Sequence, residues 1–176
     1  MNIILFGTPG AGKGTQANYI ADYLSLYKIS TGDLLRKEIQ SKTELGKKIK
    51  SLINKGSFVS DQIINDLVEN ILSTKSINHR LIFDGYPRNL PQARNLDLLL
   101  KKHEQKILCV FSLSVNKKTI IKRIVGRQVC SKCGKIFNEF FQPSTLKNHS
   151  CGDTYLSKRS DDNEKIIISR FDTYIN

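Results

Sequence analysis

Residues 7–15, with the sequence GTPGAGKGT, have the types and spacing best suited to a chemical role. A glycine-rich turn between a strand and a helix exposes backbone N–H groups to a phosphate, and the helix N-terminus adds to the attraction. Lys13 supplies a mobile cation at the same place. In the strict pattern Ser or Thr follows the lysine directly, whereas here Gly14 comes before Thr15. The segment predicts a phosphate-binding loop.

Several arginines lie beside Gly, Pro or Asp, unlike the lysines, which are scattered among Asn, Ile and Ser. Arginine forms planar, bidentate contacts with phosphate oxygens, so this placement favours a polyanionic small molecule as ligand. The histidines show no pairing that suggests acid–base catalysis. The arginines concerned are Arg36, Arg88, Arg123, Arg127, Arg159 and Arg170.

The four cysteines fall into a cluster and a single residue. Cys130, Cys133 and Cys151 are close together in sequence and include a C-x-x-C pair, which indicates a metal site rather than a disulfide scaffold. Cys109 lies inside the apolar run ILCVFSLSV, and we expect it to be a small core residue.

The elements that must position these residues alternate along the chain. Residues 2–6 (NIILF) form a continuous apolar run, typical of a parallel strand buried on both faces, and a helical apolar pattern follows from Ala17 to Leu24. The runs RLIFDGYPR and KILCVFSLSV each precede a further helical pattern. This alternation predicts a parallel sheet with helices on both sides.

Two regions interrupt this order. Residues 31–60 are lysine-rich and helical in pattern, with Thr31 at the entry and Gly56 as the expected stop. Residues 128–158 contain glycine, cysteine and aromatic residues without a helical period, which predicts short strands and turns. A helical pattern returns over residues 161–175.

Composition narrows the class of protein. An apolar content of 39% and the lack of any apolar run of about 18 residues predict a globular protein without a membrane span. The apolar start has no basic region before it and reads as a strand, so we expect a cytoplasmic protein. The net charge of +12 could indicate a nucleic-acid surface, but scattered lysines are typical of a solvated face.

The GKGT loop resembles that of adenylate kinases and related nucleoside monophosphate kinases. STGDLLR at 30–36, FDGYPRNLPQA at 83–93, RIVGR at 123–127 and RSDD at 159–162 resemble further segments of that family in the same order. The resemblance implies an α/β fold: a P-loop three-layer α/β/α core with a parallel sheet, a helical AMP-side insertion and a small β-rich lid. The implied boundaries are 1–29, 61–127 and 160–176 for the core, 30–60 for the AMP-binding insertion and 128–159 for the lid.

The resemblance also implies roles for individual residues. The AMP-binding set is Thr31, Arg36, Ser57, Phe58, Val59, Gly85, Tyr86, Pro87, Arg88, Gln92, Arg159 and Arg170. The ATP-binding set is Gly10, Ala11, Gly12, Lys13, Gly14, Thr15, Arg123, Arg127, Ile136 and Phe137. Lys13, Arg88, Arg127, Arg159 and Arg170 would be catalytic, and Asp84 would hold Mg²⁺ through water.

The cysteine cluster resembles the zinc-bearing lid of some family members. Counted back from Arg159, Cys151 matches the family's fourth ligand and the third position is Asn148, a poor zinc ligand. We expect structural zinc on Cys130, Cys133 and Cys151 with His149, and Asp153 is the alternative fourth ligand.

The resemblance implies reversible phosphoryl transfer from MgATP to AMP, giving two ADP, by a monomer that binds neither nucleic acid nor membrane. A UMP/CMP-type nucleoside monophosphate kinase, a zinc-knuckle nucleic-acid-binding protein and an inactive relative remain alternatives. Thr31 and Gln92 favour AMP. Family members usually continue with one more strand and a final helix, which this sequence apparently lacks, so we expect an uncovered strand edge.

Overall fold

The computed structural model describes residues 1–54, 59–74, 80–159 and 161–175. These residues divide into two compact units. The first contains residues 1–7 and 12–113, and the second contains residues 8–11 and 114–176. The predicted stop at Gly56 and the predicted AMP-site residues Ser57 and Phe58 lie outside the described residues.

The first unit is built on a parallel sheet with the strand order β2-β3-β1-β4. Its strands are β1 (Asn2–Gly7), β2 (Tyr27–Ser30), β3 (Leu81–Asp84) and β4 (Ile107–Leu113). Its helices are α1 (Lys13–Leu24), α2 (Thr31–Gln40), α3 (Glu44–Asn54), α4 (Asp61–Leu72) and α5 (Leu90–Lys102). The parallel α/β arrangement predicted from the alternating runs is confirmed, whereas β2 had no strong signal in the sequence.

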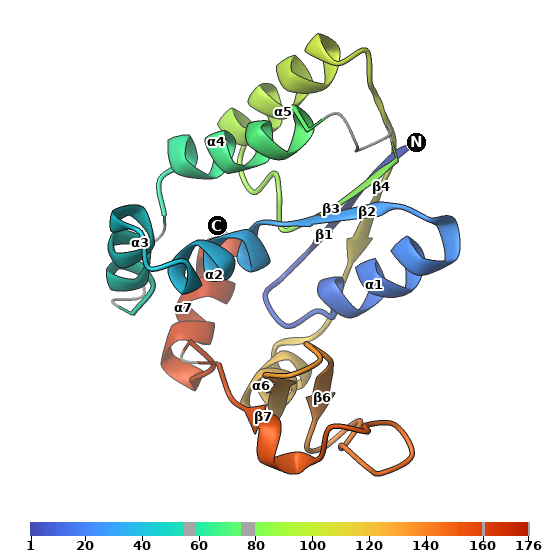
Figure 1. Ribbon diagram of the computed structural model, residues 1–176, viewed down its shortest axis with the longest axis vertical. Helices are drawn as coiled ribbons and strands as arrows, with labels where there is room; N and C mark the ends of the chain where they lie inside the picture. The colour runs from blue at the N-terminus through green and yellow to red at the C-terminus, as the bar shows by residue number, and fades with distance from the viewer. Residues whose placement is uncertain (55–58, 75–79, 160, 176) are drawn as a thin grey trace. The chain divides into compact units, whose positions relative to one another are not determined.

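The strands of the sheet alternate their side chains between two apolar layers, with α1 on one side and α4 and α5 on the other (Figure 1). Ile3 and Leu5 of β1 face α1, where Ala17 and Ala21 are buried, while Ile4 faces the opposite layer. Both faces of the central strands are covered, which explains their continuous apolar sequence.

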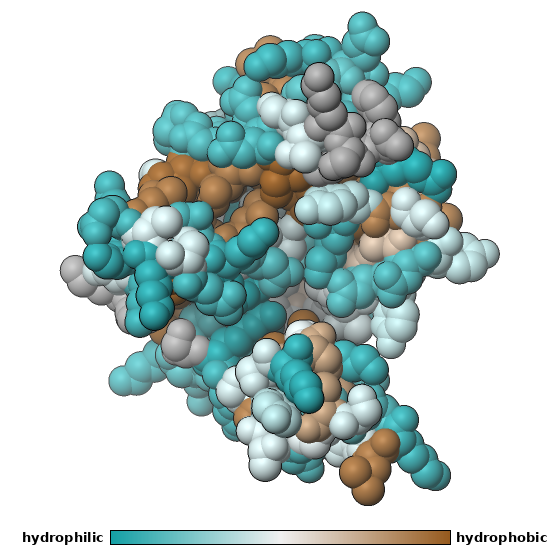
Figure 2. Space-filling view, viewed as in Figure 1, coloured by the Kyte–Doolittle hydropathy of each residue, from teal (hydrophilic) through white to brown (hydrophobic). Residues whose placement is uncertain are grey.

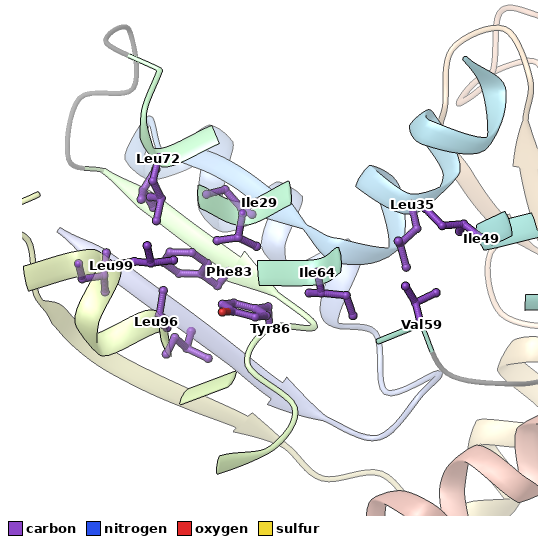
Figure 3. Close-up of a cluster of buried hydrophobic side chains, with 14 residues drawn as sticks. Ile29, Leu35, Ile49, Val59, Ile64, Leu72, Phe83, Tyr86, Leu96 and Leu99 are labelled. Atoms are coloured by element: carbon purple, nitrogen blue, oxygen red, sulfur yellow. The ribbon is translucent and has the colours of Figure 1, made fainter. Parts of the chain in front are cut away.

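The larger core lies between the sheet and the helices α4 and α5. Figure 3 shows Leu72 of α4 and Leu99 of α5 near Phe83 of β3, with Tyr86 beside it. Phe83 and Tyr86 are completely buried, and burial of such a side chain contributes about 1.5–3 kcal/mol. In the space-filling view the outward surface of α4 is largely hydrophilic, and hydrophobic side chains gather between it and the strands (Figure 2).

β4 is less buried than its apolar sequence, KILCVFSLSV, suggests. Leu108, Val110 and Phe111 are exposed, whereas Cys109 is partly buried and packs against the layer beneath α1. Among the described residues β4 pairs only with β1, so its other edge and part of its surface are open.

The second unit contains two helices and a small antiparallel sheet. The helices are α6 (Lys117–Val125) and α7 (Glu164–Ile175), and the sheet has the order β6-β5-β7 with the strands β5 (Arg127–Cys130), β6 (Ile136–Asn138) and β7 (Leu156–Ser157). A short 3₁₀ helix, η1 (Asp153–Tyr155), precedes β7. Short strands and turns were predicted for this region, and Ile120, Ile124 and Ile167 form the core between α6 and α7.

Candidate nucleotide site and lid metal cluster

The phosphate-binding loop connects β1 directly to α1, as predicted. β1 ends at Gly7 and α1 begins at Lys13, whose ammonium donates to the Gly7 carbonyl oxygen at 2.7 Å. Gly14 lies so close to Asp84 that a side chain there would meet the Asp84 carboxylate at 3.2 Å. The lysine, the helix N-terminus and a carboxylate therefore lie together where β1 and β3 end, which is the edge at which parallel α/β sheets bind ligands.

Gly10 of the loop packs against α6 within the second unit. A Cβ on Gly10 would lie 2.6 Å from the Ile124 side chain, and the residue has a positive φ of 80°. Arg123 of the same helix donates to the Ala11 carbonyl oxygen at 3.1 Å. Glycine at this position is therefore required by close packing as well as by backbone conformation.

Burial raises the pKa of Asp84, and the positive charge of Lys13 offsets part of that rise. Lys28 and Arg88 also lower this pKa, while the Asp33 charge raises it. A carboxylate that is partly desolvated and close to cations suits a position beside a hydrated divalent ion, because such an ion restores the charged form.

Gly85 brings two predicted AMP-site residues together at the end of β3. Its carbonyl oxygen accepts from the Thr31 hydroxyl at 2.9 Å and from Arg88 Nε at 2.8 Å. Gly85 has a φ of 76°, and a Cβ would approach the Arg88 guanidinium at 3.1 Å and the Thr31 hydroxyl at 3.3 Å. Only glycine leaves room for both contacts without strain.

Arg36 lies on α2, whose first residue is Thr31. Its guanidinium donates to Asp33 and packs near Gly32, where a Cβ would meet it at 3.2 Å. Burial disfavours the Asp33 carboxylate, but the hydrogen bond and charge of Arg36 outweigh this effect and lower the pKa of Asp33. Asp33 thus holds Arg36 near the start of α2, the helix that begins with Thr31 directly after β2.

Gln92 is buried and its amide is oriented by two fixed partners. Gln92 Oε1 accepts from the Arg88 backbone N–H at 2.8 Å, and Nε2 donates to Asp61 at 2.5 Å. Asn89 also donates to Asp61, at 2.9 Å. Asp61 was not predicted from the sequence, because no local motif connects the start of α4 with α5.

The first unit also contains Val59, Tyr86 and Pro87, which were predicted to belong to the AMP site. Val59 and Tyr86 are buried, and the Tyr86 hydroxyl donates to Asn65 at 2.8 Å while it accepts from Asn95 at 3.1 Å. Pro87 follows Tyr86 through a cis peptide bond. Tyr86 therefore contributes to the core rather than presenting a free hydroxyl.

Two arginines of the second unit are held by neighbouring aspartates. Arg127 makes a bidentate contact with Asp162, whose side chain is only 1% exposed, and Arg170 donates to Asp161 at 2.7 Å. Burial disfavours the Asp161 carboxylate, but the hydrogen bond and charge of Arg170, with a smaller contribution from the charge of Arg127, help to lower the pKa of Asp161 below its usual value. Arg159 precedes these aspartates, and its carbonyl oxygen accepts from the Asp162 N–H at 3.1 Å. The RSDD segment therefore contains Arg159 and supplies the aspartates that bind Arg127 and Arg170.

Three residues of the predicted ATP-binding set, Arg123, Ile136 and Phe137, have different surroundings. The Arg123 guanidinium lies 6.0 Å from the centroid of the Phe141 ring, which is exposed. Phe137 is buried and packs on His149 at 4.7 Å between ring centroids, while Ile136 is partly buried at the start of β6. The Phe137 side chain is therefore not accessible to a ligand in this arrangement.

The lid region brings together the four predicted zinc ligands. Ligand atoms of Cys130, Cys133, His149 and Cys151 all lie within 4.8 Å of one another, and the four cysteines of the chain are free thiols. His149 Nε2 is buried without a hydrogen-bond partner among the described residues. Three sulfurs and an imidazole nitrogen are the donor set that structural zinc takes, so the cluster could bind zinc.

The thiols of the cluster have shifted acidities. Burial disfavours the Cys130 thiolate, but hydrogen bonding, most strongly from the Cys133 backbone N–H, outweighs it and lowers the pKa of Cys130 to about 6. Burial and the neighbouring thiols Cys133 and Cys130 raise the pKa of Cys151. A bound cation would favour the thiolate form of Cys151, because its positive charge offsets the effect of the neighbouring thiols.

A phosphate-binding loop on a parallel sheet, together with arginines placed around the strand ends, defines a P-loop phosphotransferase acting on nucleotides. A family model described as adenylate kinase matches residues 5–176, and the chain belongs to that family.

Curated adenylate kinases are similar over nearly the whole chain. That of Pelagibacter ubique (strain HTCC1062) is 50% identical over 175 residues, which cover 99% of this chain and 82% of the relative. That of Mycoplasma mycoides subsp. mycoides SC is 45% identical over 175 residues, with 99% and 81% covered. That of Fervidobacterium nodosum is 42% identical over 177 residues, again with 99% and 81% covered. No helix among the described residues is both long enough and apolar enough to cross a membrane.

Proposed function

We propose that this chain catalyses reversible phosphoryl transfer from MgATP to AMP, giving two ADP. Family membership supports the activity. The observation that carries the residue assignment is the convergence of Lys13, Asp84 and Arg88 at the ends of β1 and β3, with Thr31 and Arg36 following β2. Phosphoryl transfer depends on positioning and charge neutralisation, and these residues supply both.

In this proposal the two nucleotides use different residue sets. Arg36 and Arg88 bind the AMP phosphate, Thr31 and Gln92 bind on the AMP base side, and residues 10–15 cradle the ATP phosphates. Arg127, Arg159 and Arg170 neutralise the transferring group, and Arg123 contacts the ATP base. Mg²⁺ neutralises phosphate charge when it is bound, and Asp84 orients its water ligands.

The fixed amide of Gln92 supports a preference for adenine. Asp61 accepts one Nε2 hydrogen, so the second amide hydrogen keeps a defined direction and can donate to a ring nitrogen. Comparison of initial rates with AMP, UMP, CMP and GMP tests this preference. A higher kcat/KM for UMP or CMP would favour the pyrimidine monophosphate kinase instead.

Structural zinc on Cys130, Cys133, His149 and Cys151 completes the proposed lid. Such a closed site would hold β5 and the segment before β7 together without taking part in the reaction. Zinc binding needs reduced thiols, which supports a cytoplasmic location. We expect the protein to act as a monomer.

The test of the activity is ADP formation by wild type, Arg88→Ala and the control Arg94→Ala. Arg88 and Arg94 are both exposed, but only Arg88 contacts Gly85 at the end of β3. We expect Arg88→Ala to lower kcat/KM for AMP by about 100-fold or more with an unchanged melting temperature, since it removes a phosphate contact rather than core volume. Wild-type activity in Arg88→Ala, or equal losses in both variants, would contradict the assignment.

A further inference from the structure

His149 is connected to a chain of hydrogen bonds on the side of its ring away from Nε2. Its Nδ1 lies 2.9 Å from the Ser144 hydroxyl oxygen, and the same hydroxyl donates to Asp153 Oδ1 at 2.7 Å. His149 is only 1% exposed, and Phe137 packs on its ring. The imidazole is therefore held from its face and from one nitrogen.

The protons available in the hydrogen bonds between His149, Ser144 and Asp153 determine which nitrogen of the imidazole carries a proton. A carboxylate can only accept a hydrogen bond, so Asp153 takes the single hydroxyl proton of Ser144. The Ser144 oxygen must then accept from His149, which requires the proton on Nδ1. In the neutral ring, Nε2 is left with a lone pair, and this buried atom has no hydrogen-bond partner among the described residues. Because Nδ1 is occupied by Ser144, Nε2 is the nitrogen through which His149 can take part in the cysteine cluster.

Hydrogen bonds from Asn148 and His149 fix the backbone around Ser144, whose hydroxyl contacts His149 Nδ1. Asn148 Oδ1 accepts from the Thr145 N–H at 2.9 Å, and the Asn148 amide donates to the Pro143 carbonyl at 3.1 Å. The His149 N–H donates to the Thr145 carbonyl at 2.9 Å. Asn148 thus closes the turn that places Ser144 beside Nδ1 of the imidazole.

We propose that Ser144 and Asp153 are positioning residues that fix His149 as the Nε2 ligand of the lid metal. Asp153 acts through Ser144 and does not coordinate the ion, which answers the choice of fourth ligand left open by the sequence. This inference rests on the zinc site of the proposed function. Groups that orient a ligating histidine in this way typically change metal affinity by about 10-fold to 100-fold.

The experiment measures zinc affinity of the full chain by competition with a chromogenic chelator. We expect Ser144→Ala and Asp153→Asn each to weaken zinc binding about tenfold, and Ser144→Thr, which keeps the hydroxyl, to bind as wild type does. The double variant should be little weaker than Ser144→Ala alone, because the two residues act in series. Ser157→Ala is the matched control, since that lid hydroxyl donates to the Val129 carbonyl oxygen rather than to the cysteine cluster.

A second readout separates orientation from coordination. Co²⁺ bound in place of zinc gives visible absorption bands that depend on the donor atoms, and Asp153→Asn should leave those bands unchanged while His149→Ala alters them. Wild-type zinc affinity in Ser144→Ala, or altered absorption bands in Asp153→Asn, would overturn this inference but not the zinc site itself. A wild-type protein that binds no zinc would overturn both the inference and the zinc site, while ADP formation tests the kinase activity separately.

Discussion

At the scale of single residues, the site depends on charged groups that are partly buried before any nucleotide binds. Asp84 is the clearest case, because burial raises its pKa although Lys13 and Arg88 are near. Its ionised form is thus disfavoured in the nucleotide-free protein. The same carboxylate is suited to hold a hydrated Mg²⁺, so function and stability conflict at this position.

We expect Asp84→Asn to raise the melting temperature of the nucleotide-free protein and to lower kcat by about tenfold or more. A carboxyl group whose pKa is raised in the folded protein costs no stability below its unfolded pKa, and the cost develops as pH rises through the raised value. The stability difference between variant and wild type, measured by thermal unfolding, should therefore be largest near neutral pH and shrink as pH falls towards 4. A variant less stable than wild type at pH 7 would contradict this account.

At the scale of elements, the lid sheet is too small to be stable by its strands alone. β6 has three residues and β7 has two, and both pair only with β5 among the described residues. A two- or three-stranded sheet of this length needs additional packing or a cross-link. The cluster of cysteines and His149 provides such a cross-link when it holds a metal ion.

Removal of zinc by a chelator should increase amide hydrogen exchange in β5, β6 and β7 while exchange in α1 stays the same. Hydrogen-exchange mass spectrometry on the full chain measures both regions at once. Cys133→Ser should reproduce the effect of the chelator, whereas the control Cys109→Ala should keep full zinc content because Cys109 packs against a core of the first unit. Equal exchange with and without zinc would show that the metal does not support the lid.

At the scale of the whole molecule, the proposed function assigns two nucleotides to residues from two compact units. Arg36 belongs to the first unit and is held by Asp33, and Arg123 belongs to the second unit and contacts Ala11. Ligand binding to the folded state raises stability by about 2.7 kcal/mol at 100 times the dissociation constant. Thermal shifts can therefore report each nucleotide separately.

We expect Arg36→Ala to reduce the thermal shift caused by AMP but not that caused by ATP, and Arg123→Ala to do the reverse. Each variant is the control for the other, because both remove one arginine from a partly exposed position. The measurement is the melting temperature over a series of AMP or ATP concentrations. A loss of both shifts in either variant would mean that the assignment of that arginine to one nucleotide is wrong.

The sequence by itself determined the features that depend on a few adjacent residues. The loop of residues 7–15, the C-x-x-C pair and the apolar runs of β1 and β3 were predicted correctly, because the geometry of such segments follows from neighbouring residues. Tertiary structure alone decided which side chains hold the site residues in place. Asp61 with Gln92 and Asp162 with Arg127 join residues far apart in the chain, so their pairing depends on how helices and strands pack. The sequence favoured His149 over Asp153 as the fourth ligand, but the burial of His149 and its hydrogen bonds through Ser144 to Asp153 are properties of the tertiary structure.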